Sequence, residues 1–429
     1  MKKMLALVLA LIMLFSISSM SLAEAPKGSG NTKTYRILSG FAENEANMKN
    51  LLWVIDKYQK EVDPDFKYEL EIITSTNDLW EKVRLYLNGD TLPDIFSFYN
   101  GPLAEEMISR GLLVNMGELL KEVGLYDITN KALIDFFTSA DGNMYMIPSS
   151  RTGEFFIYRK DVFDKYGLTA PTTWEEFINV CEVLKSNGEV AYNMRGADSV
   201  QYLRFLAFPG WTTTGGGFIT SCLTGESFAD SDLGMYCANL LYKLGTSGYF
   251  VPGYESLTMG DALDVFCGGT GAIAYTNTNN ISEKLQEMYD AGQVGFFGIP
   301  VMEGVEGTGT NWLQHGGKSW AVNAEVYNDD PVLADFVKFW LKNANEASYS
   351  NGALSWFDTE VPEGAFPNIT AAVAVELQKA TVGWVSWDDK MTAATLTEVG
   401  DAAEKLAHGV ISPEEFAKIF DQTVEDNGG

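Results

Sequence analysis

Few residues in this chain have the type and the spacing that covalent or metal-dependent chemistry requires. The cysteines stand 41, 15 and 30 residues apart, which matches no zinc-binding pattern, and the only two histidines are His315 and His408. Metal catalysis and serine–histidine catalysis therefore lack their residues, so the sequence predicts no catalytic residue, no metal and no cofactor. The cysteines allow three disulfide pairings, among which the sequence does not choose. They are Cys181, which lies in a predicted apolar helix stripe and is expected to be buried, Cys222, Cys237 and Cys267.

Carboxylates are the reactive groups that the chain holds in quantity, with 58 Asp and Glu against 30 Lys and Arg. Adjacent pairs such as Glu105–Glu106 and Asp388–Asp389 have the residue type of glycosidase acid–base pairs. In so acidic a chain such pairs arise by chance, so we expect them to be solvated, and a secreted glycan-degrading enzyme stays an alternative. The formal net charge of −28 repels phosphate backbones and anionic lipid headgroups, which argues against nucleic-acid or membrane-surface binding.

Residues suited to non-covalent binding stand in stretches without helical periodicity. Asn277, Asn279 and Asn280 place three amides within four residues after a predicted strand, and Trp384 and Trp387 lie in a second such stretch. Flat aromatic rings pack against the apolar faces of a ligand, and amides form hydrogen bonds with hydroxyl groups. The amides could instead serve a turn, and the tryptophans could pack beneath C-terminal helices, so both interpretations stay open.

The first residues have the three regions of a secretory signal peptide. Lys2 and Lys3 precede an apolar run over residues 4–15, and the small-residue pattern around residues 21–23 favours cleavage after Ala23. The run is short for a membrane span, and no other stretch approaches the length of about 18 apolar residues that a span needs. The sequence therefore predicts an exported, secreted protein.

The elements that must position these residues alternate between strand and helix. Apolar residues recur with the 3.6-residue helical period over residues 48–62 and alternate with polar residues over 66–72. Strand and helix in this alternation predict a parallel α/β sheet, and capping boxes at 173–176 and 412–415 predict two later helix starts. The predicted order is a strand at 35–38, a helix over 48–62, a strand at 66–72, a helix that Asn77 caps and Gly89 ends, and a strand at 95–98.

Four segments carry motifs that occur together in one protein family. They are residues 89–96, with G-x-x-P-D-I/V-like spacing; 141–163, similar to D-G-K-x-Y-x-x-P followed by Y-N-K-D-x-F; 166–177, similar to G-L-x-x-P-x-T-W-x-E-F; and 266–273, a looser match to F-x-x-G-K-A-A-M. In this order the segments resemble the extracellular solute-binding proteins of ABC importers, family 1, which include maltose-binding proteins. Arg159 replaces the family's usual Asn in the second segment.

The resemblance implies a periplasmic-binding-protein-like α/β fold of two lobes. Each lobe is expected to be a mostly parallel sheet flanked by helices, with the ligand cleft between the lobes. The chain is expected to cross between lobes near 148–151, 314–317 and 355–358, with Gly316 and Gly317 as a hinge. The implied domains are the signal peptide at 1–23, an N-terminal lobe of 32–148 plus 318–356, and a C-terminal lobe of 149–316 plus 357–429.

The same resemblance, together with the stretches described above, selects twelve candidate ligand-binding residues. Arg151 could fork onto vicinal hydroxyls or a carboxylate, or form a salt bridge at the hinge. Relatives often carry a stacking Trp near position 279, where this chain has Asn279, which weakens a maltose-like assignment. The candidates are Phe41, Glu43, Phe98, Tyr99, Asn100, Arg151, Thr152, Trp211, Asn277, Asn279, Trp384 and Trp387.

The family further implies a binding protein, not an enzyme. It would capture a mono- or oligosaccharide by lobe closure and deliver it to the transmembrane subunits of an ABC permease, acting as a monomer. A non-sugar solute such as a glycerophosphodiester, a polyamine or a peptide stays an alternative. The aromatic content of 13% favours a carbohydrate only modestly, because rings also fill cores.

Overall fold

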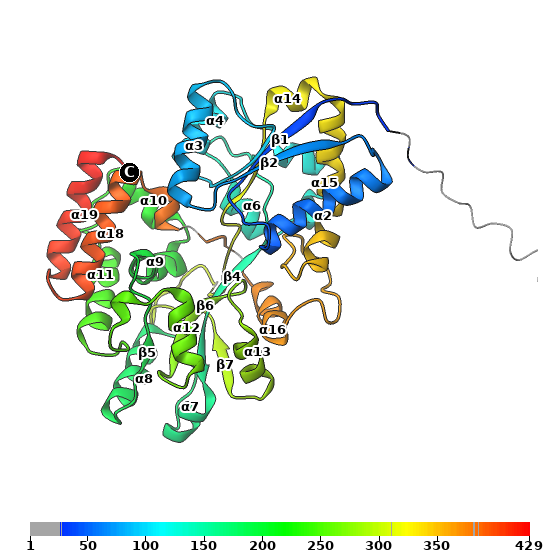
Figure 1. Ribbon diagram of the computed structural model, residues 1–429. Helices are drawn as coiled ribbons and strands as arrows, with labels where there is room; N and C mark the ends of the chain where they lie inside the picture. The colour runs from blue at the N-terminus through cyan, green and yellow to red at the C-terminus, as the bar shows by residue number, and fades with distance from the viewer. Residues whose placement is uncertain (1–25, 27, 310, 381, 385) are drawn as a thin grey trace, which may run out of the picture.

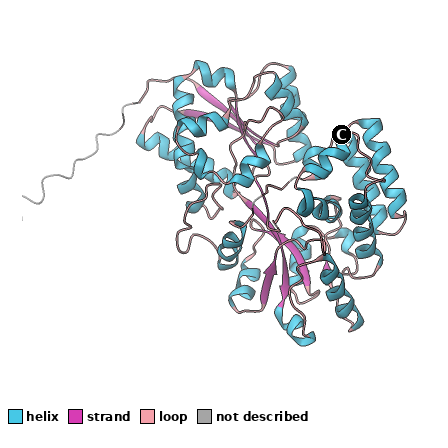
Figure 2. Cartoon of the chain, turned by 180° about the vertical axis from the view of Figure 1, so that it is seen from behind, coloured by secondary structure: helices cyan, strands magenta, loops and turns pink. Residues whose placement is uncertain are grey.

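The computed structural model of the chain describes residues 26, 28–309, 311–380, 382–384 and 386–429. The signal peptide predicted over residues 1–23 lies outside the described residues. Two separate sheets, each surrounded by helices, form the two halves of the molecule (Figures 1 and 2). We call these halves the first lobe and the second lobe, after the order in which the chain builds their sheets.

The first lobe is built on a four-stranded sheet with the order β2-β1-β3-β9. β1 pairs in parallel with both β2 and β3, whereas β9 runs antiparallel to β3. The three strands predicted from hydrophobic periodicity are therefore confirmed, and so is the mostly parallel sheet of this lobe. The strands are β1 (Thr34–Ser39), β2 (Lys67–Ile72), β3 (Ile95–Phe98) and β9 (Ser319–Val322).

The helices of the first lobe cover this sheet, and α2 buries the predicted residues Met48, Leu51 and Ile55. The start of α3 was predicted at a cap by Asn77, which is wrong: Ser75 is the cap, and its side chain accepts a hydrogen bond from the Asp78 backbone N–H. The helices are α2 (Ala46–Glu61), α3 (Thr76–Asn88), α4 (Pro102–Ser109), α5 (Met116–Glu122), α6 (Lys131–Phe137), α14 (Ala324–Asp329) and α15 (Pro331–Ser350), with a 3-10 turn at Tyr126–Ile128.

The second lobe is built on a five-stranded sheet whose pairing differs from the prediction. A mostly parallel sheet is the expectation for this lobe too, and it is wrong. β4 runs antiparallel to β6, β7 and β8, whereas β5 and β6 pair in parallel. The cause is the direction in which β4 runs: it starts at the junction with the first lobe, whereas β6 and β8, which pair with it, end there. The strands are β4 (Thr152–Arg159), β5 (Tyr192–Asn193), β6 (Ile273–Asn277), β7 (Val294–Phe297) and β8 (Leu313–His315).

Helices enclose the second sheet and form a further layer beyond it, in which α9, α11, α18 and α19 contact one another. Both predicted capping boxes are present, at the starts of α8 and α19. The helices are α7 (Lys160–Tyr166), α8 (Trp174–Ser186), α9 (Val200–Thr214), α10 (Gly217–Leu223), α11 (Asp232–Thr246), α12 (Met259–Cys267), α13 (Glu283–Asp290), α16 (Asn368–Leu377), α17 (Trp387–Lys390), α18 (Ala393–Ala407) and α19 (Pro413–Asn427), with a 3-10 turn at Tyr254–Ser256.

The carboxyl ends of most strands converge on the junction between the lobes. Phe98, at the end of β3, pairs with Ser319, and His315, at the end of β8, pairs with Thr152 at the start of β4. The chain therefore leaves the second sheet after β8 and enters the first at β9 within a few residues. Loops at the carboxyl ends of parallel strands are where α/β folds bind ligands, so this junction is the place to seek a site.

The four cysteines are free thiols in this structure, and Cys181 is buried, as its place in an apolar stripe predicts. Burial raises the pKa of the Cys181 thiol, so it behaves as a small apolar side chain. Among the described residues, no helix combines the length and the apolar character that crossing a bilayer requires.

Candidate functional site

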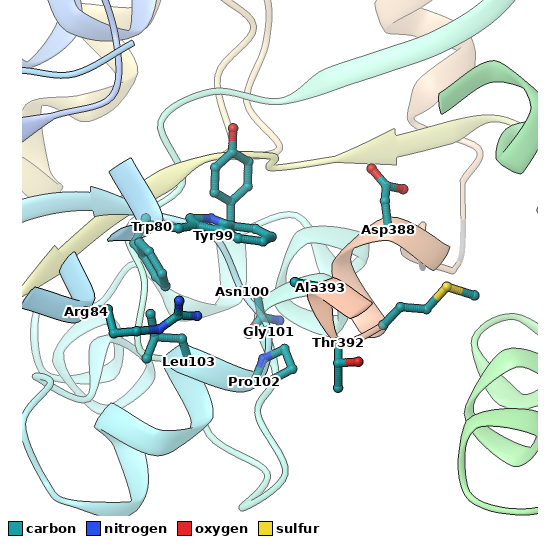
Figure 3. A pocket seen from close by; sticks show the side chains of 12 residues that line it. Trp80, Arg84, Tyr99, Asn100, Gly101, Pro102, Leu103, Asp388, Thr392 and Ala393 are labelled. Carbon is teal, nitrogen blue, oxygen red and sulfur yellow. The ribbon is translucent and has the colours of Figure 1, made fainter. Parts of the chain in front are cut away.

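A cavity of about 160 Å³ lies between the two lobes. The first lobe contributes one wall from α3 and from the stretch that runs from the end of β3 to the start of α4. The second lobe contributes the other wall from α17 and the start of α18 (Figure 3). The lining residues are Trp80, Arg84, Phe98, Tyr99, Asn100, Gly101, Pro102, Leu103, Asp388, Met391, Thr392 and Ala393.

The wall from the first lobe is aromatic. The rings of Trp80 and Tyr99 meet edge to face, with centroids 6.0 Å apart and planes at 83°, and Phe98 is buried behind them at the end of β3. Asn100 donates a hydrogen bond of 2.8 Å from Nδ2 to the Phe136 carbonyl, which fixes its amide against α6. This wall therefore offers flat apolar surface held in place by the sheet and by α6.

Charge in the cavity comes from one residue on each wall. Among the described lining residues, Arg84 on α3 is the one cation and Asp388 on α17 is the one acid. Arg84 is exposed, whereas the Asp388 side chain is 27% exposed and bound to Arg204 behind it. Figure 3 shows the Trp80 and Tyr99 rings on one side of the gap and Asp388 on the other.

Asp388 is held by side chains of its own lobe. Its Oδ1 accepts a hydrogen bond of 2.8 Å from Arg204 Nη1 and another from the Ser386 hydroxyl. Burial by itself would raise the pKa of Asp388, but the Arg204 guanidinium lowers it, so the carboxylate stays ionised. The expectation that the acidic pair at 388–389 is merely solvated is therefore wrong for Asp388, because a buried arginine lies behind it.

A second carboxylate, Glu154 on β4, lies on the other side of Arg204. Arg204 Nε donates to Glu154 Oε2 over 3.1 Å, the Tyr275 hydroxyl donates to the same oxygen, and His315 Nε2 lies 3.1 Å from Oε1. Burial by itself would raise the pKa of Glu154, but Arg204 and His315 hold that pKa well below its usual range. The wall from the second lobe thus rests on a buried ionic network that joins β4, β6, β8, α9 and α17.

A family model matches residues 42–347, more than two thirds of the 429 residues, and it describes the bacterial extracellular solute-binding proteins. The chain belongs to this family. The family predicted from the four motif segments is thereby confirmed.

Two curated relatives match part of this solute-binding protein. A multiple sugar-binding protein of Streptococcus mutans is 23% identical over 38% of this chain and 36% of its own length. The sn-glycerol-3-phosphate-binding periplasmic protein UgpB of Agrobacterium fabrum is 26% identical over 22% of this chain and 23% of its own length. The matched parts thus span about a third and about a quarter of these relatives.

A solved structure shares the fold along nearly the whole chain. The solute-binding protein RafE, solved in complex with raffinose, superimposes with a TM-score of 0.66 at 16% identity, over 93% of this chain and all of that one. The two-lobe α/β fold predicted from the sequence is thereby confirmed, and the proteins to which this solute-binding protein is similar are binding proteins rather than enzymes.

Three of the twelve candidate residues, Phe98, Tyr99 and Asn100, line the cavity. Two more stand at the exit of β1. Phe41 is buried, with its ring centroid 5.5 Å from that of Trp320 and 4.5 Å from Lys318 Nζ, and Glu43 is exposed. A ligand contact for Phe41 and Glu43 stays a prediction.

Arg151 and Thr152, at the start of β4, are buried at the junction. Arg151 Nη1 lies 3.0 Å from Asp358 Oδ1, so the guanidinium forms a salt bridge; the place of this salt bridge at a hinge stays a prediction. Thr152 accepts a hydrogen bond of 3.0 Å from Asn279 Nδ2. Asn277 Oδ1 accepts from the Asn279 backbone N–H and from Asn280 Nδ2, which is the turn role foreseen for these amides.

The three candidate tryptophans are buried in the second lobe. Trp211 was expected in a contact loop, which is wrong, because α9 runs through it; this helix is buried on nearly all sides, so its sequence shows no 3.6-residue period. Trp211 donates a hydrogen bond from Nε1 to the Gly383 carbonyl and packs 5.4 Å from Trp384. Trp387 packs 5.7 Å from Phe420.

Sequence reasoning did not select Trp80, Arg84 and Asp388, which line the cavity, or Arg204, which lies behind Asp388. Trp80 and Arg84 stand four residues apart on α3, so they share one face of the helix, next to the face that Leu79 turns toward the core. This spacing is the feature of the sequence that could have indicated that both residues lie on one surface. Nothing in the sequence pairs Arg204 with Asp388, which lie 184 residues apart.

Proposed function

We propose that this protein binds a mono- or oligosaccharide in the cavity between its lobes, as the solute-binding component of an ABC importer. The observation that carries the proposal is the pairing of the two walls: Trp80 and Tyr99 face the cavity from the first lobe, and Asp388 faces it from the second. A pyranose has apolar faces that suit the rings, and its hydroxyl groups can donate hydrogen bonds to an ionised carboxylate.

Lobe closure would couple binding to transport. We propose that residues 32–148 plus 318–356 and residues 149–316 plus 357–429 move as the two bodies, with Gly317, at φ 55°, at the hinge. A ligand that touches both walls is bound most tightly when the lobes approach, and this difference in affinity drives closure. The exported protein, a monomer, would then present its closed form to the permease.

A panel of sugars tests the proposal. The mature protein is heated with galactose, maltose, raffinose, stachyose or chitobiose, and a sugar that binds raises the melting temperature further as its concentration rises above the dissociation constant. Isothermal titration then gives the affinity of each such sugar, and chromatography of the recovered sugar checks that it is unchanged. The absence of any thermal shift across the panel would reject the carbohydrate assignment, and an altered sugar would indicate an enzyme.

An anionic solute is a second candidate, because one of the two curated relatives is named for glycerol 3-phosphate. A phosphate ligand needs convergent cations or backbone N–H donors, and Arg84 is the one cation among the described lining residues, opposite the Asp388 carboxylate. We therefore favour a neutral sugar. Adding sn-glycerol 3-phosphate to the same panel separates the two candidates directly.

A further inference from the structure

The buried network behind the second-lobe wall contains an arginine held between two carboxylates. Arg204, buried on α9, points Nε at Glu154 and Nη1 at Asp388, over 3.1 and 2.8 Å. These two donors leave the planar guanidinium in fixed, different directions, a geometry that a lysine ammonium does not reproduce. The position of one carboxylate is therefore set relative to the other through Arg204.

Arg204 itself has little freedom to move. Glu154, its first partner, is fixed by the Tyr275 hydroxyl on β6 and by His315 on β8, so it is tied to three strands of the sheet. The guanidinium carbon also lies 5.1 Å from the centroid of the buried Trp384 ring, within the range of a cation–π contact. The rigid sheet thus extends through Arg204 to the rim of the cavity.

Asp388 depends on this support because its own element is short. It lies in α17, which has four residues, and both side-chain hydrogen bonds described for it, from Arg204 and from Ser386, end on Oδ1. Because two donors hold Oδ1, the carboxylate keeps one orientation while it lines the cavity. A group already fixed before binding loses less entropy when the ligand arrives.

We propose that Arg204 is a positioning residue for ligand binding, which acts by holding Asp388 in the orientation that the ligand's hydroxyl groups require. The inference rests on the proposed function. It assigns Trp384 a place beneath the arginine, and it makes Glu154 the anchor through which the sheet determines the geometry of the cavity wall.

A double-mutant cycle tests the proposal, with the affinity of each sugar that binds in the panel as the readout. Arg204→Lys keeps the charge but loses the two fixed donor directions, so we expect binding to weaken about tenfold. Asp388→Ala removes both carboxylate oxygens, still leaves Arg204 paired with Glu154, and should fold. In that background Arg204→Lys should weaken binding no further, because Arg204 has lost the group through which it acts.

The control is Arg159→Lys, which alters a different arginine, at the last residue of β4, that also forms a salt bridge with a carboxylate, Asp161, away from the cavity. It should leave affinity unchanged. Equal losses from Arg204→Lys with and without Asp388→Ala would overturn the proposal, since a general structural role predicts the same loss in both backgrounds. If Arg204→Lys does not fold, Ser386→Ala takes its place in the cycle with the same expected non-additivity. It removes the other donor to Asp388 and also the hydroxyl that accepts a hydrogen bond of 2.7 Å from Arg204 Nη1.

A measurement without ligand separates this inference from the proposed function. In a crystal structure of Arg204→Lys we expect Glu154 to keep its place and the Asp388 carboxylate to turn away from its wild-type orientation. An unmoved Asp388 carboxylate would overturn the inference even if sugars bind. If no sugar in the panel binds, the proposed function fails, and this structure still decides whether Arg204 positions Asp388.

Discussion

The ring of Trp80 offers the cavity a flat apolar surface, with Tyr99 set edge-on against it. Trp80→Ala removes this surface and should weaken sugar binding about tenfold or more, since buried tryptophans dominate many binding sites. Isothermal titration measures the loss. Trp53→Ala is the matched control, because Trp53 is a half-buried tryptophan on α2 of the same lobe that does not line the cavity. Equal losses in both variants would contradict a specific role for Trp80.

Glu154 ties the stability of the protein to pH. Burial would raise its pKa, but Arg204 and His315 hold it below the usual value, so the folded state favours the ionised form. This contribution is complete above the ordinary carboxyl range and is lost as the pH falls from about 5 toward the folded-state pKa. We expect the free energy of unfolding to decrease over that window.

Glu154→Gln should make this acid-side decrease shallower, because the substituted side chain no longer binds the proton. At pH 7 it should lower the free energy of unfolding by about 2 kcal/mol, since charge-assisted hydrogen bonds to the carboxylate are lost. Urea unfolding monitored between pH 7 and pH 3 measures both effects. Glu81→Gln, at an exposed acid on α3, should leave the curve unchanged, and a Glu154→Gln curve of wild-type steepness would contradict the argument.

At the scale of the elements, α6 of the first lobe packs directly against the second lobe at Gly383. A Cβ at Gly383 would lie 2.3 Å from the Ala132 carbonyl oxygen and 3.2 Å from the Phe136 backbone nitrogen, so Gly383→Ala must displace α6 or the segment that carries Gly383. We expect Gly383→Ala to lower the free energy of unfolding by about 1–3 kcal/mol. Thermal unfolding measures the change.

Gly260→Ala is the control for this substitution. Gly260 lies in α12, and the nearest atom to an added Cβ is Thr258 Oγ1 at 3.8 Å, so an alanine fits there and favours the helix. It should raise the melting temperature slightly, whereas Gly383→Ala should lower it. A Gly383→Ala melting temperature equal to that of the wild type would contradict this prediction, because it would show that the contact between Gly383 and α6 can widen without loss of stability.

The elements also show which features of the fold and of the cavity can be predicted from the sequence. Local periodicity was enough for β1, β2 and β3, since alternation and the helical period depend on near neighbours. The antiparallel pairing of β4 was not predictable in the same way, because it depends on where the chain enters the second lobe. The cavity was predicted in part, through Phe98, Tyr99 and Asn100, whereas Asp388 resembled any surface acid until its distant partner Arg204 was known.

For the whole molecule, the placement of the two walls decides what binding does to shape. Trp80 and Asp388 belong to different lobes, so a sugar that contacts both is bound most tightly when the lobes approach. Small-angle scattering of the mature protein should therefore give a smaller radius of gyration with a binding sugar than without it. A sugar from the panel that gives no thermal shift should leave the profile unchanged.

Variants of the two cavity walls test whether the smaller radius of gyration results from lobe closure. At a sugar concentration that half-saturates the wild type, Trp80→Ala and Asp388→Ala should each remain close to the ligand-free profile, since each removes contacts from one lobe. At saturating sugar, the radius of gyration of both variants should decrease again, because the remaining contacts with the two lobes still favour the closed form. If the wild-type profiles with and without bound sugar superimposed, the ligand would bind without drawing the lobes together, and closure could not be the signal that a permease reads.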